Sequence, residues 1–541
     1  MNGSQTDTGA HFHKIEVKGK IHLGYRHELL QVTRQDLTDG QYVARGHGYQ
    51  AVDSDPAKYR KEQGIGSVLD FKISDKPIDD LFIEDSGLVT SYGIFGAPGS
   101  GKTVLLMYLL EQVLKHAPDE PSKRYGALIL DPKAALINDI KSIAADAGRS
   151  EDLIIINTDL MNAAPKGDTK YNAKPINIID CTLDPYELGA ILVLAGRSAG
   201  IDASDPFRFQ EWTNLFASSL SILRAYEKFR VGHLGPKFPA VSLRGLLNSI
   251  AERSIKTKAE FLRKNLSNIP EKDREDILID IGQLNRFFSQ KYVGTVEAFI
   301  TKAFGMFRRS RLACYSDDSS RVGFPFYEDI IERGRIVVVS VSPSEPVLAK
   351  TLCTLVKCLF QRTVLSRGES KIRNKERPVV LACDEYSEIA SEVAGQSMGD
   401  GQFLALARQY GCMALLATQS VNVLSASSLK ETWRSVFSNF AAKIYMRLVD
   451  NETAEEATKL AGESDWRVMS QGQQFGGARS QWNEQQQLLG RKNLPPVILT
   501  QILKRGQGVV IGSLDGGTTT PGTFVVSVPF RVPQEAAILK K

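Results

Sequence analysis

The chain has 541 residues, of which 42% are hydrophobic and 24% are charged, and its formal net charge is +5. This is the composition of an ordinary globular protein, long enough for two or three structural units, and its small basic excess does not by itself indicate nucleic-acid binding. The six cysteines are widely separated and form no CxxC pair, which argues against a structural zinc site or a disulfide framework and favours a reducing, cytoplasmic compartment. No stretch approaches the roughly 20 apolar residues of a membrane-spanning helix, so we expect no direct membrane span.

The first 85 residues differ from the rest of the chain. Five of the seven histidines lie there, but their spacing fits no pair of metal ligands. Two short stretches, His11–Lys20 and Gln41–Ala51, alternate between apolar and polar residues as strands do. We therefore expect a small β-containing N-terminal module over residues 1–85.

A strand, a glycine-rich turn and a helix then follow one another. Leu88–Phe95 is largely apolar, the next eight residues read GAPGSGKT, and Thr103–Lys115 has helical spacing. In a GxxxxGK[ST] loop the backbone N–H groups wrap around phosphates, so we expect Lys102 to reach the β- and γ-phosphates of ATP and the Thr103 hydroxyl to ligate Mg²⁺. The predicted nucleotide-binding residues of this loop are Gly96, Ala97, Pro98, Gly99, Ser100, Gly101, Lys102 and Thr103.

An apolar strand that ends in two carboxylates supplies the second motif. Val379–Cys383 is followed directly by Asp384 and Glu385, the pattern of a Walker B element. We expect Asp384 to hold the Mg²⁺ through its water shell and Glu385 to polarise the water that attacks ATP.

Two further polar residues are candidates for catalysis. Met413–Ala417 is another apolar strand, and Gln419 follows it, where an amide at the carboxyl end of a strand can reach the γ-phosphate or the water. Arg408 lies on the helix before that strand and is a candidate for stabilising transition-state charge from a neighbouring subunit. Without further context, both residues also fit ordinary turn and surface positions.

The order of the apolar runs predicts an α/β fold with a mostly parallel sheet, because Val- and Ile-rich runs alternate with helical segments. Between about Pro185 and Arg333 only amphipathic helical stretches occur, which indicates an inserted all-α subdomain. Trp466–Gly490 is rich in Gln, Gly and Ser and is predicted to be a mobile loop. The predicted domains are residues 1–85, residues 86–184 (first part of the ATPase domain), residues 185–333 (all-α) and residues 334–541 (second part of the ATPase domain).

Four segments resemble a known family. The phosphate loop is joined by ALILDPK at Ala127–Lys133, VVLACDEY at Val379–Tyr386 and FLALARQYGCMALLATQS at Phe403–Ser420. This set resembles the TraD/TraG-type coupling ATPases of conjugative type IV secretion, within the FtsK/HerA group of RecA-like motors. The resemblance extends over roughly residues 87–532, and the helical block lies where that family carries its all-α domain.

The resemblance implies a RecA-like ATPase that forms a ring hexamer, hydrolyses ATP between subunits and pumps DNA. It also implies a relaxase or membrane-bound secretion components as partners, and recruitment to the inner membrane by such a partner, since the sequence predicts no anchor. Arg408 matches the family's trans-acting arginine, and Asp131 matches the DPK aspartate near the nucleotide. The residues that match the nucleotide site by position are Lys102, Thr103, Asp384, Glu385 and Gln419.

The residues themselves indicate DNA binding only weakly. Basic clusters lie at Lys302–Arg311, where Phe304 and Phe307 could stack on bases, and at Arg367–Arg377. Lys430 and Arg434 are further candidates for phosphate contacts, and the loop Ser387–Gly401 could line a ring pore. A charge run is more often a solvated face.

Two alternative functions stay open at this point. One is a cytosolic HerA-like motor that serves DNA processing or phage defence with a partner. The other is an adaptor ATPase that recognises protein substrates and uses ATP binding as an assembly switch.

Overall fold

The computed structural model describes the chain in twelve parts: residue 15 and residues 17–31, 71–157, 177–200, 206–230, 241–289, 293–308, 326–368, 372–392, 399–474, 481–517 and 521–529. The chain forms two compact units. The first unit comprises residues 1–17, 114–414 and 427–439, and the second comprises residues 18–113, 415–426 and 440–541. The expected strand at Gln41–Ala51 and half of His11–Lys20 lie outside the described residues.

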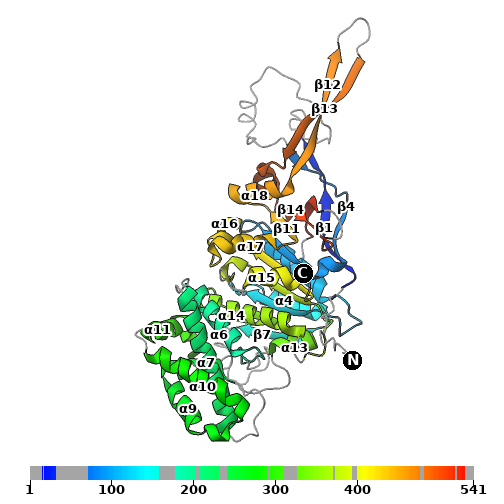
Figure 1. Cartoon of the computed structure of the whole chain (residues 1–541). Helices are drawn as coiled ribbons and strands as arrows, with labels where there is room; N and C mark the ends of the chain where they lie inside the picture. Colours follow the sequence, from blue (N-terminus) through cyan, green and yellow to red (C-terminus); the bar gives the residue numbers. More distant parts are fainter. Residues whose placement is uncertain are drawn as a thin grey trace, which may run out of the picture. The chain divides into compact units, whose positions relative to one another are not determined.

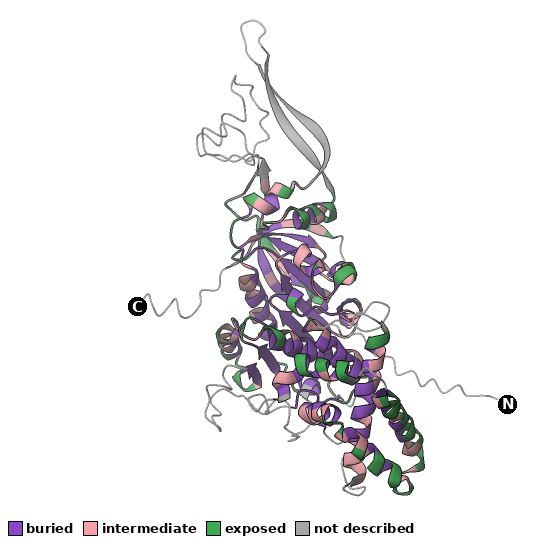
Figure 2. Ribbon diagram, turned by 90° about the vertical axis from the view of Figure 1, so that its left-hand side faces the viewer, coloured by how far each residue is buried: buried purple, intermediate pink, exposed green. Residues whose placement is uncertain are grey.

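The first unit is built on parallel strands. Their order is β9 (Val379–Cys383), β6 (Gly126–Asp131), β8 (Ile336–Ser340) and β7 (Leu153–Asn157), and the start of β10 (Cys412–Thr418) lies beside β9. Every residue of these strands is buried, as the dark strands in Figure 2 show. Such strands are rich in Val and Ile because apolar side chains on both faces are covered.

Helices surround these strands and extend the first unit (Figure 1). Between β7 and β8 the described residues form helices and no strand. Capping residues begin two of them, because the side chains of Asp184 and Ser242 accept backbone N–H groups of the first turns of α6 and α8. The helices are α4 (Ile137–Asp146), α6 (Pro185–Ser198), α7 (Pro206–Arg230), α8 (Leu243–Ala251), α9 (Ser254–Lys264), α10 (Glu271–Ser289), α11 (Val293–Phe304), α13 (Phe326–Arg333), α14 (Pro346–Leu365), α15 (Asp400–Ala407) and α17 (Trp433–Ser438), with short 3-10 turns η2 (Ser150–Asp152), η4 (Leu266–Asn268), η5 (Gly305–Arg308), η7 (Ser366–Gly368), η8 (Tyr386–Glu388) and η9 (Lys430–Thr432).

The second unit has a mixed sheet. Its strand order is β4 (Asp79–Glu84), β1 (Lys20–His27), β15 (Gly522–Ser527), β14 (Gln507–Gly512), β11 (Ala442–Met446) and β5 (Ser91–Phe95). Only β11 and β5 in this series run parallel, and the other neighbours are antiparallel. The remaining elements of the unit are β2 (Leu29–Gln31), β3 (Phe71–Ile73), η1 (Asp85–Val89), α3 (Lys102–Leu114), α16 (Val421–Ser425), α18 (Asn451–Ala461), β12 (Glu463–Gln474), β13 (Gln481–Asn493) and the π-helical turn η10 (Ile498–Ile502).

The predicted α/β class is confirmed, while the loop predicted at Trp466–Gly490 is wrong. Its described residues, Trp466–Gln474 and Gln481–Gly490, lie in the antiparallel pair β12 and β13, in which Glu463 is opposite Asn493 and Gln474 is opposite Gln481. The two strands satisfy each other's backbone hydrogen bonds, so the pair forms without the apolar alternation that sequence reasoning looks for. The predicted domain boundaries stay predictions. Within the described residues, no helix is both long and apolar enough to cross a membrane.

Candidate nucleotide site

The phosphate loop of the second unit has the backbone that its glycines predict. It leaves β5 at Phe95, which is buried, and α3 begins at Lys102. Gly99 and Gly101 have φ angles of +75° and +111°, which residues other than glycine rarely adopt. A Cβ atom at Gly96 would lie 2.6 Å from Ser100 Oγ, so this glycine is required for close packing inside the loop.

Backbone hydrogen bonds hold both ends of the loop. The Gly96 N–H donates to the carbonyl oxygens of Thr418 and Gln419, at 3.3 and 3.1 Å. Gly506 N–H donates to the Ser100 carbonyl oxygen at 2.9 Å. The structure therefore brings the predicted residue Gln419 to the start of the phosphate loop through its backbone.

Lys102 is the buried cation of the loop, with 6% of its surface exposed. Its Nζ donates to the carbonyl oxygens of Gly96 at 2.6 Å and Ala97 at 3.2 Å. Carbonyl oxygens are neutral partners, and a phosphate oxygen would be a stronger acceptor for the same ammonium. Thr103, the next residue, is partly exposed in the first turn of α3.

The loop fits a phosphate group. The hydroxyls of Ser100 and Thr418 are buried and have no hydrogen-bond partner among the described residues. Open space lies where a side chain of Gly99 would stand. Unsatisfied donors, free space and the N-terminus of α3 together form an arrangement that favours an anion.

Asp384 and Glu385 follow β9 in the first unit. Asp384 is partly exposed, whereas Glu385 is 8% exposed and has a left-handed backbone with φ +60° and ψ +48°. This conformation is strained for a residue with a side chain and occurs often at functional sites. Lys133 Nζ donates to Glu385 Oε1 at 2.7 Å, so the predicted water-polarising carboxylate already has a cationic partner.

Asp131 holds the turn that carries this lysine. It is 1% exposed, and its carboxylate accepts hydrogen bonds from Ala135 N–H at 3.1 Å, Leu136 N–H at 2.8 Å and Ser340 Oγ at 3.1 Å. These contacts fix the backbone between β6 and α4. The place of Asp131 near the nucleotide stays a prediction.

Arg408 follows the last residue of α15 and is partly exposed. Its predicted action on the nucleotide of a neighbouring subunit stays a prediction.

The aromatic part of the predicted DNA contact is wrong. Phe304 and Phe307 are completely buried within the first unit, so their rings cannot stack on bases. The basic residues around them, which suggested base stacking, do not show whether a ring is exposed, and both rings lie on the inner face of α11 and η5.

Two arginines of the basic cluster Arg367–Arg377 are buried and hydrogen-bonded to the backbone of the first unit. Arg367 is fully buried and donates to the carbonyl oxygens of Tyr410 and Arg377. Arg377 is 4% exposed and donates to carbonyl oxygens of Arg124 and Glu332. Burial lowers the pKa of both guanidinium groups to about 10.

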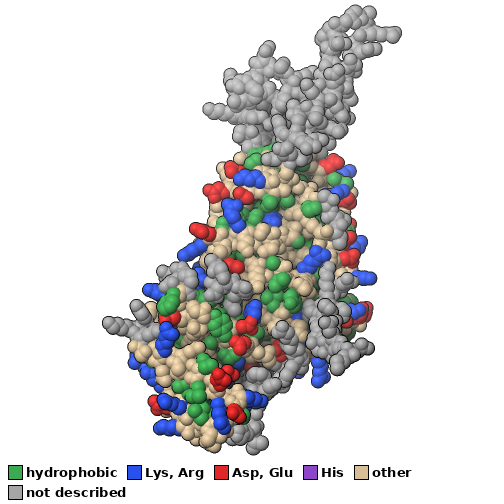
Figure 3. Space-filling model, in the orientation of Figure 1, with side chains coloured by type: hydrophobic (Ala, Val, Ile, Leu, Met, Phe, Trp, Pro, Cys, Tyr) green, Lys and Arg blue, Asp and Glu red, His purple; other side chains and the backbone are tan. Residues whose placement is uncertain are grey.

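Two basic candidates do lie at the surface. Lys430 and Arg434 are exposed, and the Arg434 guanidinium lies 4.8 Å from the centre of the Trp433 ring. On the face drawn in Figure 3, basic and acidic side chains are interspersed over the described surface. The argument for DNA therefore does not come from a basic patch on this face.

Sequence reasoning missed two lysines. Lys133 belongs to the DPK segment, where only the aspartate was assigned a role. Lys357 lies in the middle of α14, is fully buried, and pairs with Asp400 at 2.6 Å. A lysine within the apolar run TLVKCLF was the available signal, because lysine is almost never buried without a partner.

Residues 378–503 match the family described as the TraM recognition site of TraD and TraG. Among solved structures, the plasmid coupling protein TrwB with the ATP analogue ADPNP is 14% identical, with 83% of this chain and 86% of that chain covered and a TM-score of 0.50. TrwB with ADP and Mg²⁺ is 13% identical, with 94% and 96% covered and a TM-score of 0.51. No curated protein sequence matches this chain.

At this low identity, the likeness to TrwB shows the fold, and it agrees with the predicted RecA-like arrangement of a phosphate loop on an α/β sheet. The matched segment contains Asp384, Glu385, Arg408 and Gln419. The chain thus carries a segment similar to the TraM recognition site of TraD and TraG, on a fold similar to that of TrwB.

Proposed function

We propose that this protein is an ATP-hydrolysing DNA translocase that acts in conjugative transfer. The observation that carries the proposal is the phosphate loop, which contains two positive-φ glycines, the buried Ser100 hydroxyl without a partner among the described residues, and the ammonium of Lys102. TrwB, whose fold the chain shares, has been seen with the ATP analogue ADPNP and with ADP and Mg²⁺. ATP and Mg²⁺ are the ligands that these residues fit.

Each residue has a specific role in this proposal. Lys102 binds the β- and γ-phosphates, and Thr103 and Asp384 would hold Mg²⁺, which supplies neutralisation of phosphate charge when bound. Glu385 accepts a hydrogen bond from the attacking water and so aligns it, and Gln419 binds the γ-phosphate or that water. The assignment of the two motifs to one nucleotide rests on their pairing in the sequence.

The proposal extends to assembly and partners. We infer a homohexamer in which Arg408 acts on the nucleotide of the next subunit, with Lys430 and Arg434 as exposed candidates for DNA phosphates. The description of the matched family also points to a TraM-like protein as a partner of residues 378–503. A relaxase or a membrane-bound secretion component would recruit the protein to the inner membrane.

The test is the steady-state ATPase rate with and without single- and double-stranded DNA. We expect DNA to raise the rate several-fold, Lys102→Ala to abolish turnover, and Arg408→Ala to remove most of it. Mixing the two variants should restore part of the activity, because each supplies what the other lacks. Arg263→Ala, at an exposed arginine of α9, is the matched control and should behave as wild type.

Turnover without any response to DNA would refute the translocase and favour the adaptor that switches on ATP binding. A response to DNA by a protein that acts with a nuclease partner would favour the HerA-like motor over conjugation. Failure of the mixed variants to recover activity would remove the proposed trans-acting role of Arg408.

A further inference from the structure

A buried carboxylate at the start of α15 is the centre of a polar cluster in the first unit. Asp400 is 1% exposed. Its Oδ2 accepts hydrogen bonds from Lys357 Nζ at 2.6 Å, Tyr386 OH at 2.5 Å and Ser391 N–H at 2.9 Å, and its Oδ1 accepts one from Gln361 Nε2 at 2.8 Å. Four donors around one carboxylate keep Asp400 in a single position.

The ammonium of Lys357 also has a hydrogen-bond acceptor for each of its donors. Besides Asp400, its ammonium donates to the Ile389 carbonyl oxygen at 2.6 Å and to Ser391 Oγ at 3.0 Å, which accounts for its three donors. Buried ion pairs add little net stability compared with apolar packing, and their best-attested use is to specify one conformation. The cluster is therefore better explained by what it positions than by what it stabilises.

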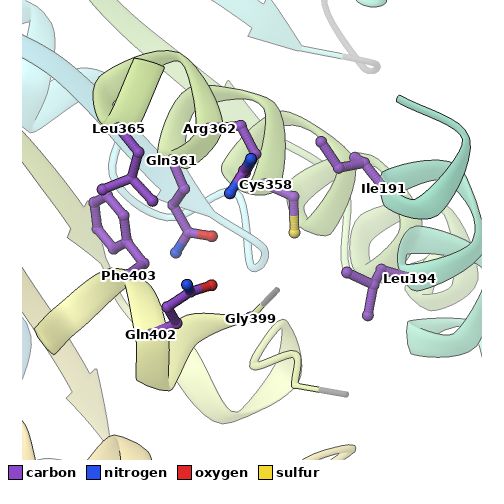
Figure 4. A pocket seen from close by; sticks show the side chains of 9 residues that line it. All are labelled: Ile191, Leu194, Cys358, Gln361, Arg362, Leu365, Gly399, Gln402 and Phe403. Carbon is purple, nitrogen blue, oxygen red and sulfur yellow. The ribbon is translucent and has the colours of Figure 1, made fainter. Parts of the chain in front are cut away.

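Three separate segments meet in this cluster. Lys357 and Gln361 come from α14, Tyr386 and Ser391 come from the turn after β9, and Asp400 begins α15. Gln361 of this cluster also lines a pocket together with Gly399, Gln402 and Phe403 (Figure 4). One residue after Asp400, Gly401 N–H donates to Glu392 Oε2 at 2.6 Å.

The turn that the cluster holds contains the strained residue Glu385. Tyr386 follows Glu385 directly and is 1% exposed. A left-handed backbone at a glutamate persists only where the surrounding structure imposes it. Within this turn Glu388 N–H donates to the Glu385 carbonyl oxygen at 3.0 Å. The Tyr386 hydroxyl donates to Asp400 and so holds the same turn against α15.

We propose that Tyr386 and Asp400 are positioning residues for ATP hydrolysis. Neither carries out chemistry in this proposal; their hydrogen bond holds Glu385 in the conformation that aligns the attacking water. The inference rests on the proposed ATPase function. Because Asp400 also begins the helix that Arg408 follows, the cluster joins the backbones that carry both proposed catalytic groups.

Tyr386→Phe removes only the hydroxyl of this contact and keeps the ring. We expect kcat for ATP to fall about tenfold with KM unchanged, because a small displacement of a catalytic group affects the chemical step and leaves phosphate binding intact. Tyr327→Phe is the matched control: Tyr327 is also fully buried in the first unit, and its hydroxyl donates to the Ile178 carbonyl oxygen at 2.6 Å. It should lower thermal stability to a similar extent without changing kcat.

The outcomes separate this inference from the function on which it rests. Wild-type protein without ATPase activity would overturn both. Glu385→Gln with full activity would leave the ATPase function standing and overturn the role of Glu385 together with the positioning role. An active wild type, an inactive Glu385→Gln and equal kcat values for Tyr386→Phe and Tyr327→Phe would overturn only the positioning role. If Tyr386→Phe does not fold, Gln361→Met removes the milder contact on Oδ1 and should lower kcat about threefold, and an unchanged kcat would refute the role.

Discussion

At the scale of single residues, the contact between Lys133 and Glu385 has the most direct bearing on catalysis. The lysine side chain is 49% exposed and the glutamate side chain 10%, with 2.7 Å between Nζ and Oε1. A half-exposed ion pair contributes little to folding, about 0–1 kcal/mol, because solvent screens it. Its effect on the orientation of Glu385 can be larger, because the chemical step depends on the direction of that carboxylate.

Lys133→Met tests this orientation. We predict a fall in kcat of about three- to tenfold and a change in unfolding free energy below about 1 kcal/mol. Turnover assays and thermal unfolding measure the two quantities. Lys123→Met is the control, because Lys123 forms an exposed pair with Glu120 at 2.6 Å in the same unit. A larger effect on stability than on kcat would contradict the prediction.

At the scale of one element, β11 carries an unusual cation. Lys443 is 8% exposed between β5 and β14, where it is in register with Gly93 and Ile511. Its Nζ donates to the Phe440 carbonyl oxygen at 3.0 Å. Burial lowers the pKa of this lysine from 10.5 to about 8, because the sheet solvates the ammonium less well than water does.

This pKa predicts how stability changes with pH. Between pH 8 and 10.5 the unfolded chain binds a proton at Lys443 that the folded protein does not, so the contribution of Lys443 to stability rises with pH across that window. Below pH 8 Lys443 is charged in the folded protein, and the full free-energy cost of burying its ammonium lowers stability. Lys443→Met should therefore be about 1–3 kcal/mol more stable than wild type at pH 7. Denaturant unfolding from pH 7 to 10.5 should show this gap closing, and a constant gap would contradict burial of the ammonium as its cause.

At the scale of the whole chain, segments 500 positions apart pair with each other. In the second unit β1 is antiparallel to β15, with Tyr25 opposite Ser527, and His27 Nε2 lies 2.7 Å from Ser527 Oγ. A Cβ atom at Gly24 would lie 2.7 Å from the Ser527 backbone oxygen, which cannot move without disturbing the pair. The sheet that contains β5 is thus extended by strands from both ends of the chain.

Gly24→Ala should therefore destabilise the second unit by about 1–3 kcal/mol through overpacking. Hydrogen exchange at the β15 amides, together with thermal unfolding, measures the loss. Gly282→Ala is the control, because Gly282 is exposed on α10 with open space around it, and alanine should stabilise that helix by about 0.5–1 kcal/mol. Equal behaviour of the two variants would show that the close contact at β15 is unimportant.

What the sequence alone determined is local. The phosphate loop, the strand before Asp384 and the strand before Gln419 could be recognised because their function depends on residues at fixed spacing along a few turns of chain. The buried strands could be recognised because Val and Ile cluster where both faces of a sheet are covered. The TraD/TraG resemblance rests on the same short segments.

Tertiary structure alone decided the rest, because it depends on residues distant in sequence. Asp400 and Glu385 are bound by side chains from other elements, such as Lys357 and Lys133. No rule of sequence spacing connects these residues. Phe304 and Arg367 belong to basic clusters whose composition is typical of a nucleic-acid-binding surface, yet both residues are buried. Whether a side chain meets solvent or the core is settled only when the elements pack and each polar group must find a partner or remain in water.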